Sequence, residues 1–164
     1  MQAEGEFALV MEKLEASLEL SGQPVKRGTM AHKHIVYMML VEAAAQLQDV
    51  APLKKYAELL EELAGQDNHQ PYLAVAHRAW GIVHRLSGDY DSSEERLQQA
   101  LAIFVDMDAR WQIGRTRIEL AELELARSAV DAAGEQYSQA LESFEALQAQ
   151  PDVARTQAAL AAMA

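Results

Sequence analysis

Histidines are the residues of this chain best suited to hold a metal ion, and their spacing argues against one. His77 and His84 are seven residues apart, so on a helix they would share a face but lie about 10 Å apart along it. His32 and His34 are two residues apart and would point in different directions on a helix. The sequence contains no cysteine and no His-Glu-x-x-His motif, which excludes thiolate zinc sites and the zinc-protease arrangement. We therefore expect no metal site and no cofactor.

Carboxylate pairs are the second group that could do chemistry, as a general acid and base. The pairs are Glu61 with Glu62, Glu94 with Glu95, and Glu119 with Glu122. No candidate nucleophile and no glycine-rich phosphate loop accompanies them in the sequence. The formal net charge of −11 also opposes nucleic acid as a partner, because phosphate binding needs a basic face. We expect no catalytic residues and no enzymatic activity.

The composition and the N-terminal residues bear on fold class and location. Half of the 164 residues are hydrophobic but only 6% are aromatic, and the abundance of Ala, Leu, Glu and Gln favours helices. The first six residues are acidic and polar, unlike a signal peptide. The longest apolar run, residues 35–41, ends at Glu42 and is too short to span a bilayer. Together with the absence of cysteine, these features predict a soluble, cytoplasmic protein that does not bind membranes.

Apolar periodicity predicts eight helices and no strand, which makes the chain all-α. The expected ranges are 7–20, 31–48, 52–65, 71–86, 91–105, 111–126, 131–147 and 151–163. Residues 21–24, Ser-Gly-Gln-Pro, are expected to end the first helix, and a polar, basic connector follows to residue 29. The pair Gly88-Asp89 predicts a tight turn, and Asp91 with Glu94 predicts a capping box for the helix after it.

The helices repeat with a step of forty residues. Arg115-Thr116 aligns with Arg155-Thr156, and Leu120 aligns with Leu160. Hairpins of fixed length cannot bury an apolar face alone, so we expect them to stack as a single domain. Its expected parts within 1–164 are an N-terminal helix and connector at 1–30, a degenerate repeat at 31–70, repeats at 71–110 and 111–150, and a terminal half-repeat or capping helix at 151–164. The predicted core includes Trp80, Leu97, Leu101, Leu120, Tyr137 and Leu141.

The best-formed copy resembles the tetratricopeptide repeat (TPR). The resemblance rests on Trp80-Gly81, Gly88-Asp89-Tyr90 and Ala100-Leu101, and the step of forty is similar to the longer repeats of bacterial signalling proteins and transcription regulators. His84 and Ser93 depart from the family's usual tyrosine and alanine. The resemblance implies a right-handed superhelix, or solenoid, of antiparallel helical hairpins whose first helices line a concave face. Gly81 would let the two helices of its hairpin pack closely.

The resemblance also implies which residues line that concave groove. They are Val75, Arg78, Ile82, Arg85, Arg115, Ile118, Glu122 and Arg155, with Ala158, and Ile35, Met38 and Glu42 from the degenerate repeat. Arginine forks suit carboxylates, so an acidic peptide or a chain terminus would fit them. Alternatively, the arginines pair with neighbouring helix glutamates, as Arg115 could with Glu119 four residues later. Met30, Met38 and Met39 either form an adaptable binding surface or fill irregular core space.

These features predict a protein–protein interaction module or scaffold, free-standing or within a larger bacterial signalling or transcription regulator. The alternative is a peptide-sensing regulatory domain of the quorum-sensing type, in which groove occupancy changes the superhelix. The last predicted helix, residues 151–163, is apolar on most sides, and no helix follows to cover it. A homodimer, a further domain or simple capping would each account for it; we favour the homodimer.

Overall fold

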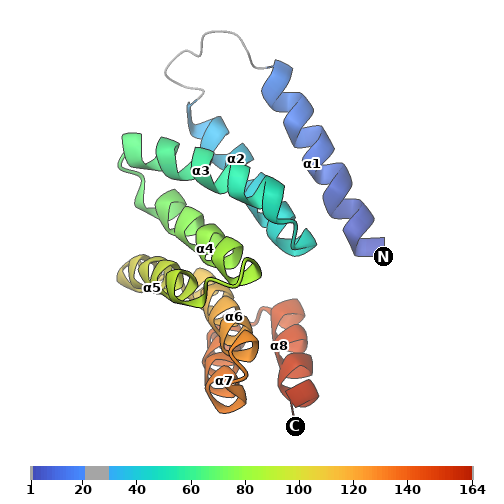
Figure 1. The fold of residues 1–164 in the computed structure, drawn as a ribbon, viewed down its shortest axis with the longest axis vertical. Coiled ribbons are helices and arrows are strands. Elements are labelled where there is room, and N and C mark those ends of the chain that lie inside the picture. Colours follow the sequence, from blue (N-terminus) through green and yellow to red (C-terminus); the bar gives the residue numbers. More distant parts are fainter. Residues whose placement is uncertain (1, 21–29, 164) are drawn as a thin grey trace.

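The computed structural model describes residues 2–20 and 30–163. Within these ranges the chain forms eight α-helices and no strand, so the predicted all-α class is confirmed (Figure 1). The helices are α1 (Gln2–Leu20), α2 (Met30–Leu47), α3 (Val50–Gln66), α4 (Gln70–Leu86), α5 (Tyr90–Asp106), α6 (Arg110–Ala126), α7 (Val130–Ala146) and α8 (Gln150–Met163). The predicted end of the first helix at 21–24 and the connector at 25–29 lie outside the described residues.

The helices stack in chain order as a solenoid of helical hairpins. Each helix packs against the next, from α1 on α2 to α7 on α8. In Figure 1 the chain runs from α1, α2 and α3 at one end of the stack to α6, α7 and α8 at the other. The first helices of successive hairpins also touch directly, α2 against α4 and α4 against α6. Side chains on these first helices are thus brought together from distant parts of the sequence.

A period of twenty residues underlies the stack. Helices α2 to α8 begin at residues 30, 50, 70, 90, 110, 130 and 150. In the connections before α3 to α8, one residue adopts a left-handed backbone conformation; these residues are Gln48, Asn68, Gly88, Asp108, Ser128 and Gln148. At the third of them the Gly88 N–H donates to the Arg85 carbonyl and the Asp89 N–H to the His84 carbonyl, which is the Schellman end of a helix. The same pair of bonds recurs at every one of the six ends.

The structure corrects three predicted helix starts. The first helix begins at Gln2, five residues before the predicted start, and two further starts are set by aspartate caps. The N-cap of α5 is Asp89, whose carboxylate accepts from the Ser92 N–H at 3.2 Å, so the capping box predicted at Asp91 was wrong and Asp91 lies in the first turn. The third helix begins at Val50, two residues before Pro52, because the Asp49 side chain caps it by accepting from the Ala51 N–H at 3.2 Å. In both cases an aspartate just ahead of the expected residue satisfies a free N–H of the first turn.

The core follows the predicted repeat register. Leu97, Leu101, Leu120 and Tyr137 are buried, as predicted, whereas Trp80 and Leu141 are half-buried at its edge. Gly81 does allow close helix packing, since a Cβ at that position would lie 2.5 Å from Cγ of Leu97. The buried Ser93 hydroxyl donates to the Gly81 carbonyl at 2.8 Å, which explains why a serine is tolerated there.

Candidate functional site

Glu42 is the centre of an ion-pair network that joins three of the first helices. The Arg78 side chain of α4 is buried, and its Nη2 lies 2.6 Å from Glu42 Oε1 on α2. The same guanidinium donates through Nη1 to Gln112 Oε1 of α6 at 2.7 Å. A buried guanidinium needs such partners because an unpaired buried charge is costly. The contacts fix the relative positions of α2, α4 and α6.

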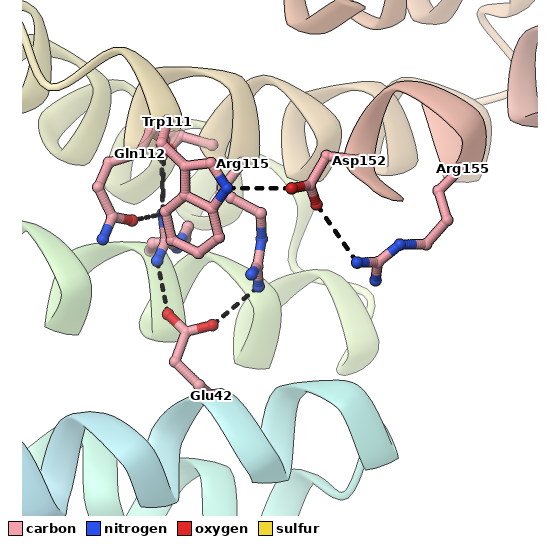
Figure 2. Close-up of polar contacts among 8 residues, drawn as sticks. Glu42, Trp111, Gln112, Arg115, Asp152 and Arg155 are labelled. Carbon is pink, nitrogen blue, oxygen red and sulfur yellow. Dashed lines mark hydrogen bonds and ion pairs between the residues drawn. The ribbon is translucent and has the colours of Figure 1, made fainter. Parts of the chain in front are cut away.

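Arg115 of α6 binds the other oxygen of the same carboxylate. Its Nη2 lies 2.8 Å from Glu42 Oε2, as Figure 2 shows. The guanidinium carbon of Arg115 is 5.1 Å from the centre of the Trp111 ring, a cation–π contact. Burial of Glu42 opposes its ionisation, but the charges and hydrogen bonds of Arg78 and Arg115 outweigh burial and lower the pKa of Glu42 below its usual value. Glu42 is therefore held as a carboxylate.

A second pair lies further along the same face. Arg85 Nη2 of α4 lies 3.3 Å from Glu119 Oε2 of α6, and both side chains are largely buried. Burial raises the pKa of Glu119 above its usual value, although Arg85 acts in the opposite direction. Beside it the Tyr137 hydroxyl of α7 donates to Glu122 at 2.5 Å. Glu119 and Glu122 are thus each paired with a side chain of a neighbouring helix.

Asp152 at the start of α8 organises the outer edge of the face. Its carboxylate accepts from Trp111 Nε1 at 3.1 Å and from Arg155 Nη2 at 3.3 Å (Figure 2). The Arg155 side chain is 68% exposed, in contrast to 3% for Arg78 and 17% for Arg115. Among the arginines predicted to line the groove, Arg155 is thus the cation most available to a partner.

Two adjoining pockets, each of about 320 Å³, lie on this face. They share Gln46, Arg115 and Arg155. The first, between α6, α7 and α8, is further lined by Ile118, Glu119, Glu122, Tyr137, Asp152, Thr156 and Ala159. The second, between α1, α2, α6 and α8, is further lined by Phe7, Val10, Met38, Met39, Glu42 and Ala43. We call the two together the inner groove; it has a polar half and an apolar half.

The structure divides the predicted groove residues into two groups. Arg115, Ile118, Glu122 and Arg155 line the inner groove, together with Met38 and Glu42 of the degenerate repeat. Val75 and Ile82 instead lie in the hydrophobic core, and Arg78 is buried beneath the surface. The reason is that α4 is packed by first helices on both sides, α2 and α6, as well as by α3 and α5.

Three of the predicted groove arginines do pair with helix glutamates, as in the predicted alternative, but Arg115 does not pair with the suggested Glu119. Arg115 binds Glu42 of α2, and Glu119 binds Arg85 of α4, so these ion pairs join helices instead of lying along one helix. Met38 and Met39 line the apolar half of the inner groove, and Met39 is 41% exposed. The side chain of Met30 lies outside the described residues.

Sequence reasoning missed several residues of the inner groove and of the polar network beside it. Gln112 and Asp152 occupy the same position of their helices, three residues before Arg115 and Arg155, and that shared spacing could have identified them. Phe7 and Val10 could not have been found in this way, because α1 does not follow the period of forty residues. Trp111, 39% exposed beside Arg115, was predicted only as a helix start.

Neither similarity to known proteins nor a metal-binding or membrane-spanning pattern in the described residues indicates a function. No family model matches the sequence, and no curated protein is similar enough to count as a match. Across the described residues, no group of three or more His, Cys, Asp or Glu side chains is arranged to hold a metal ion. None of the described helices is long and apolar enough to cross a membrane. The geometry of the inner groove is therefore the basis for assigning a function.

Proposed function

We propose that this chain is a protein-interaction module of the tetratricopeptide type that binds a peptide segment in its inner groove. The observation that carries the proposal is the pair of adjoining pockets sharing Gln46, Arg115 and Arg155. Four helices distant in sequence line the apolar half, and the Glu42 network holds three of the stacked helices in place before any partner arrives. Such preorganisation lowers the entropic cost of binding.

The two halves of the inner groove suggest the chemistry of the partner. An apolar side chain fits against Phe7, Val10 and Met39, where the flexible thioether can adapt to its shape. A neighbouring carboxylate fits Arg155, which in the described part of the chain donates to Asp152 and to the Pro151 carbonyl, both on its own helix. Arg78 and Arg115 already share Glu42, so they contribute less attraction for an acidic partner than their number suggests. The expected ligand is a segment with one apolar residue close to Asp, Glu or a C-terminal carboxylate.

A peptide-sensing regulatory domain is the second candidate, and one observation favours it. The apolar pocket is lined by α1, from one end of the stack, and by Arg155 of α8, from the other. A peptide bound there would touch both ends and so favour one curvature of the solenoid. In either case we propose a cytoplasmic, non-catalytic domain that acts alone or within a larger bacterial regulator.

The test is selection from a library of short random peptides, followed by calorimetric titration of the selected peptides. We expect enrichment of an apolar residue near an acidic one, and a loss of affinity of about tenfold in Arg155→Glu and in Met39→Glu. The matched control is Lys54→Glu, an exposed lysine on α3 outside both pockets. Equal effects of Arg155→Glu and Lys54→Glu would show that binding depends on net charge and would contradict a groove-bound peptide.

The two candidates differ in what happens to the solenoid. A peptide sensor predicts that bound peptide changes the scattering profile of the protein in solution, whereas a rigid interaction module predicts an unchanged profile. Small-angle scattering with and without a selected peptide separates them.

A further inference from the structure

Helix α8 is a structural copy of α6, displaced by one hairpin. Thr116 of α6 and Thr156 of α8 are both fully buried and occupy the same position. Each hydroxyl donates to the carbonyl four residues earlier, Gln112 or Asp152, at 2.8 Å. Helices α6 and α8 therefore present the same side to the rest of the stack.

The opposite side of α8 is exposed where that of α6 is buried. The paired positions are Gly114 with Ala154 and Ala121 with Ala161; the α6 member of each pair is buried, and the two alanines of α8 are exposed. On α6 this side is covered by α7, so closely that a Cβ on Gly114 would lie 2.7 Å from the Phe144 ring. In the described part of the chain, α7 is the helix that packs on α8, and no helix occupies on α8 the place that α7 has on α6.

Two helices of this chain already cover a first helix on the side that is exposed in α8. Helices α5 and α7, which cover α4 and α6, carry the same pattern of side chains. A small residue is followed by a large residue four positions later, a small one seven positions later, a large one eight positions later and a phenylalanine eleven positions later. The two sets are Ser93, Leu97, Ala100, Leu101 and Phe104, and Ala133, Tyr137, Ala140, Leu141 and Phe144. This spacing puts all five side chains on one stripe of a helix.

Each of the two exposed alanines of α8 has a buried alanine as its counterpart in the stack. Ala154 corresponds to Ala74 of α4, and Ala161 to Ala121 of α6. Ala74 and Ala121 are both fully buried in the stack. An alanine at either position is therefore compatible with a covering helix. Because Ala154 also corresponds to Gly114 and Ala161 to Gly81, where the covering helix approaches too closely for a Cβ, a helix that covers α8 must lie slightly further from it.

The groove between α7 and α8 adds a charge requirement. This groove, of about 570 Å³, is lined by Val130, Leu160 and Met163 and by the carboxylates of Asp131 and Glu135. One hairpin earlier, the corresponding junction is occupied by Arg127, which lies just before α7 and contacts the first turn of α5. Its guanidinium donates to Glu94 at 2.8 Å, to the Tyr90 carbonyl at 3.1 Å and to Asp91 at 3.4 Å. Asp131 corresponds to Asp91, whereas Gly134 stands in place of Glu94. Because Glu135 also lines the groove, a basic residue just before a covering helix would still meet carboxylates there.

We propose that the exposed side of α8 and the α7–α8 groove bind an amphipathic helix of a partner protein. This helix has small, large, small, large and aromatic residues at the spacing found in α5 and α7, and a basic residue precedes its first turn. The surface is distinct from the inner groove, because Ala154, Ala161 and Met163 lie outside both of its pockets. The inference therefore stands independently of the proposed peptide-binding function.

The test uses a labelled synthetic peptide with the sequence of residues 127–146, which is the chain's own example of this pattern. Fluorescence anisotropy with the full-length protein measures its affinity. We expect the Ala161→Glu protein to bind about tenfold more weakly, and the peptide variants Phe144→Ala and Arg127→Glu to bind the parent protein more weakly. The matched control is Ala159→Glu, which adds the same charge to α8 on the side of the inner groove, where α6 itself carries Glu119.

Three outcomes would overturn the proposal. The first is no binding to the parent protein. The second is equal binding to the parent and to Ala161→Glu, which would show that the peptide displaces α7 from α6. The third is a dimer in sedimentation equilibrium that Ala161→Glu dissociates and the peptide does not, since a second copy would then cover α8. Circular dichroism checks that each variant is folded, and Ala154→Glu replaces Ala161→Glu if the latter is not.

Discussion

Glycines that look alike in the sequence have different consequences in this fold. Gly81 faces Leu97 so closely that a methyl group would overlap it, whereas a Cβ on Gly134 would meet nothing nearer than Met163 at 3.9 Å. Both lie inside helices, where alanine is favoured over glycine by about 1 kcal/mol. The distance to the neighbouring side chain therefore decides whether alanine destabilises the fold by steric overlap or stabilises it by helix propensity.

We predict opposite effects of alanine at these two positions. Gly81→Ala should lower the free energy of unfolding by about 1–3 kcal/mol, because overpacking forces α4 and α5 apart. Gly134→Ala should raise it by about 0.5–1 kcal/mol through helix propensity. Urea unfolding followed by circular dichroism measures both. Destabilisation of similar size in the two variants would contradict the observed packing of Leu97 on Gly81.

A second residue-scale prediction concerns Glu42 and pH. Because the pKa of Glu42 is lowered in the folded state, its contribution to stability is fully present above its unfolded pKa and is lost as the pH falls through the folded pKa. Glu42→Gln should therefore lower the free energy of unfolding by about 1–3 kcal/mol at pH 7. The difference from the parent should shrink under acidic conditions, where Glu42 is itself protonated.

Urea titrations of the parent and of Glu42→Gln over a pH series measure this difference. The matched control is Glu58→Gln, because Glu58 is exposed on α3 and makes no ion pair or side-chain hydrogen bond with the described residues. A constant difference between parent and Glu42→Gln at every pH would contradict a charge-based role of Glu42.

At the scale of the helix, the connections determine the period of twenty residues. Of the six left-handed residues that end helices, only Gly88 is a glycine. For a residue with a Cβ this backbone conformation costs about 1–2 kcal/mol. At the other five helix ends the paired hydrogen bonds and the packing of the next helix offset that cost. The strain is a consequence of stacking hairpins of equal length.

We predict that glycine at these ends stabilises the protein. Ser128→Gly and Gln148→Gly should each raise the free energy of unfolding by about 0.5–1 kcal/mol, after allowing for the greater freedom of glycine in the unfolded chain. The reverse change, Gly88→Ala, should cost about 1 kcal/mol, although a Cβ there would meet no atom within 4 Å. Thermal unfolding measures all three. Stabilisation by Gly88→Ala would contradict the left-handed geometry.

At the scale of the whole molecule, stability should vary along the stack. Helix α4 is packed by α3 and α5 and by the first helices on both sides, whereas α8 is packed mainly by α7. In a solenoid each unit is stabilised largely by its neighbours, so a terminal helix with one neighbour opens more easily than a central one.

Hydrogen exchange measured by mass spectrometry tests this gradient. Amides of α4 and α5 should exchange about tenfold or more slowly than those of α8. Addition of the peptide covering residues 127–146 should slow exchange in α8 if it binds there. Uniform protection from α2 to α8 would show that the chain unfolds as one cooperative unit.

The sequence by itself determined the helices, their order and their repeat. Periodic apolar residues and sharp polar turns are local signals, and they placed seven of the eight helix starts within two residues of those observed. The close approach at Gly81 was predictable for the same reason, because the repeat register places a small residue opposite a large one.

Only the tertiary structure decided which of the predicted groove residues line the inner groove. Val75, Ile82 and Arg78 occupy groove positions on an isolated hairpin, yet contacts of α4 with both α2 and α6 bury them. The partner of Arg115 is likewise Glu42, seventy-three residues away, where helix spacing suggested Glu119. The curvature that brings α2, α6, α8 and α1 around one groove is a sum of packing angles between neighbours. No short stretch of sequence encodes that sum, whereas each helix is encoded locally.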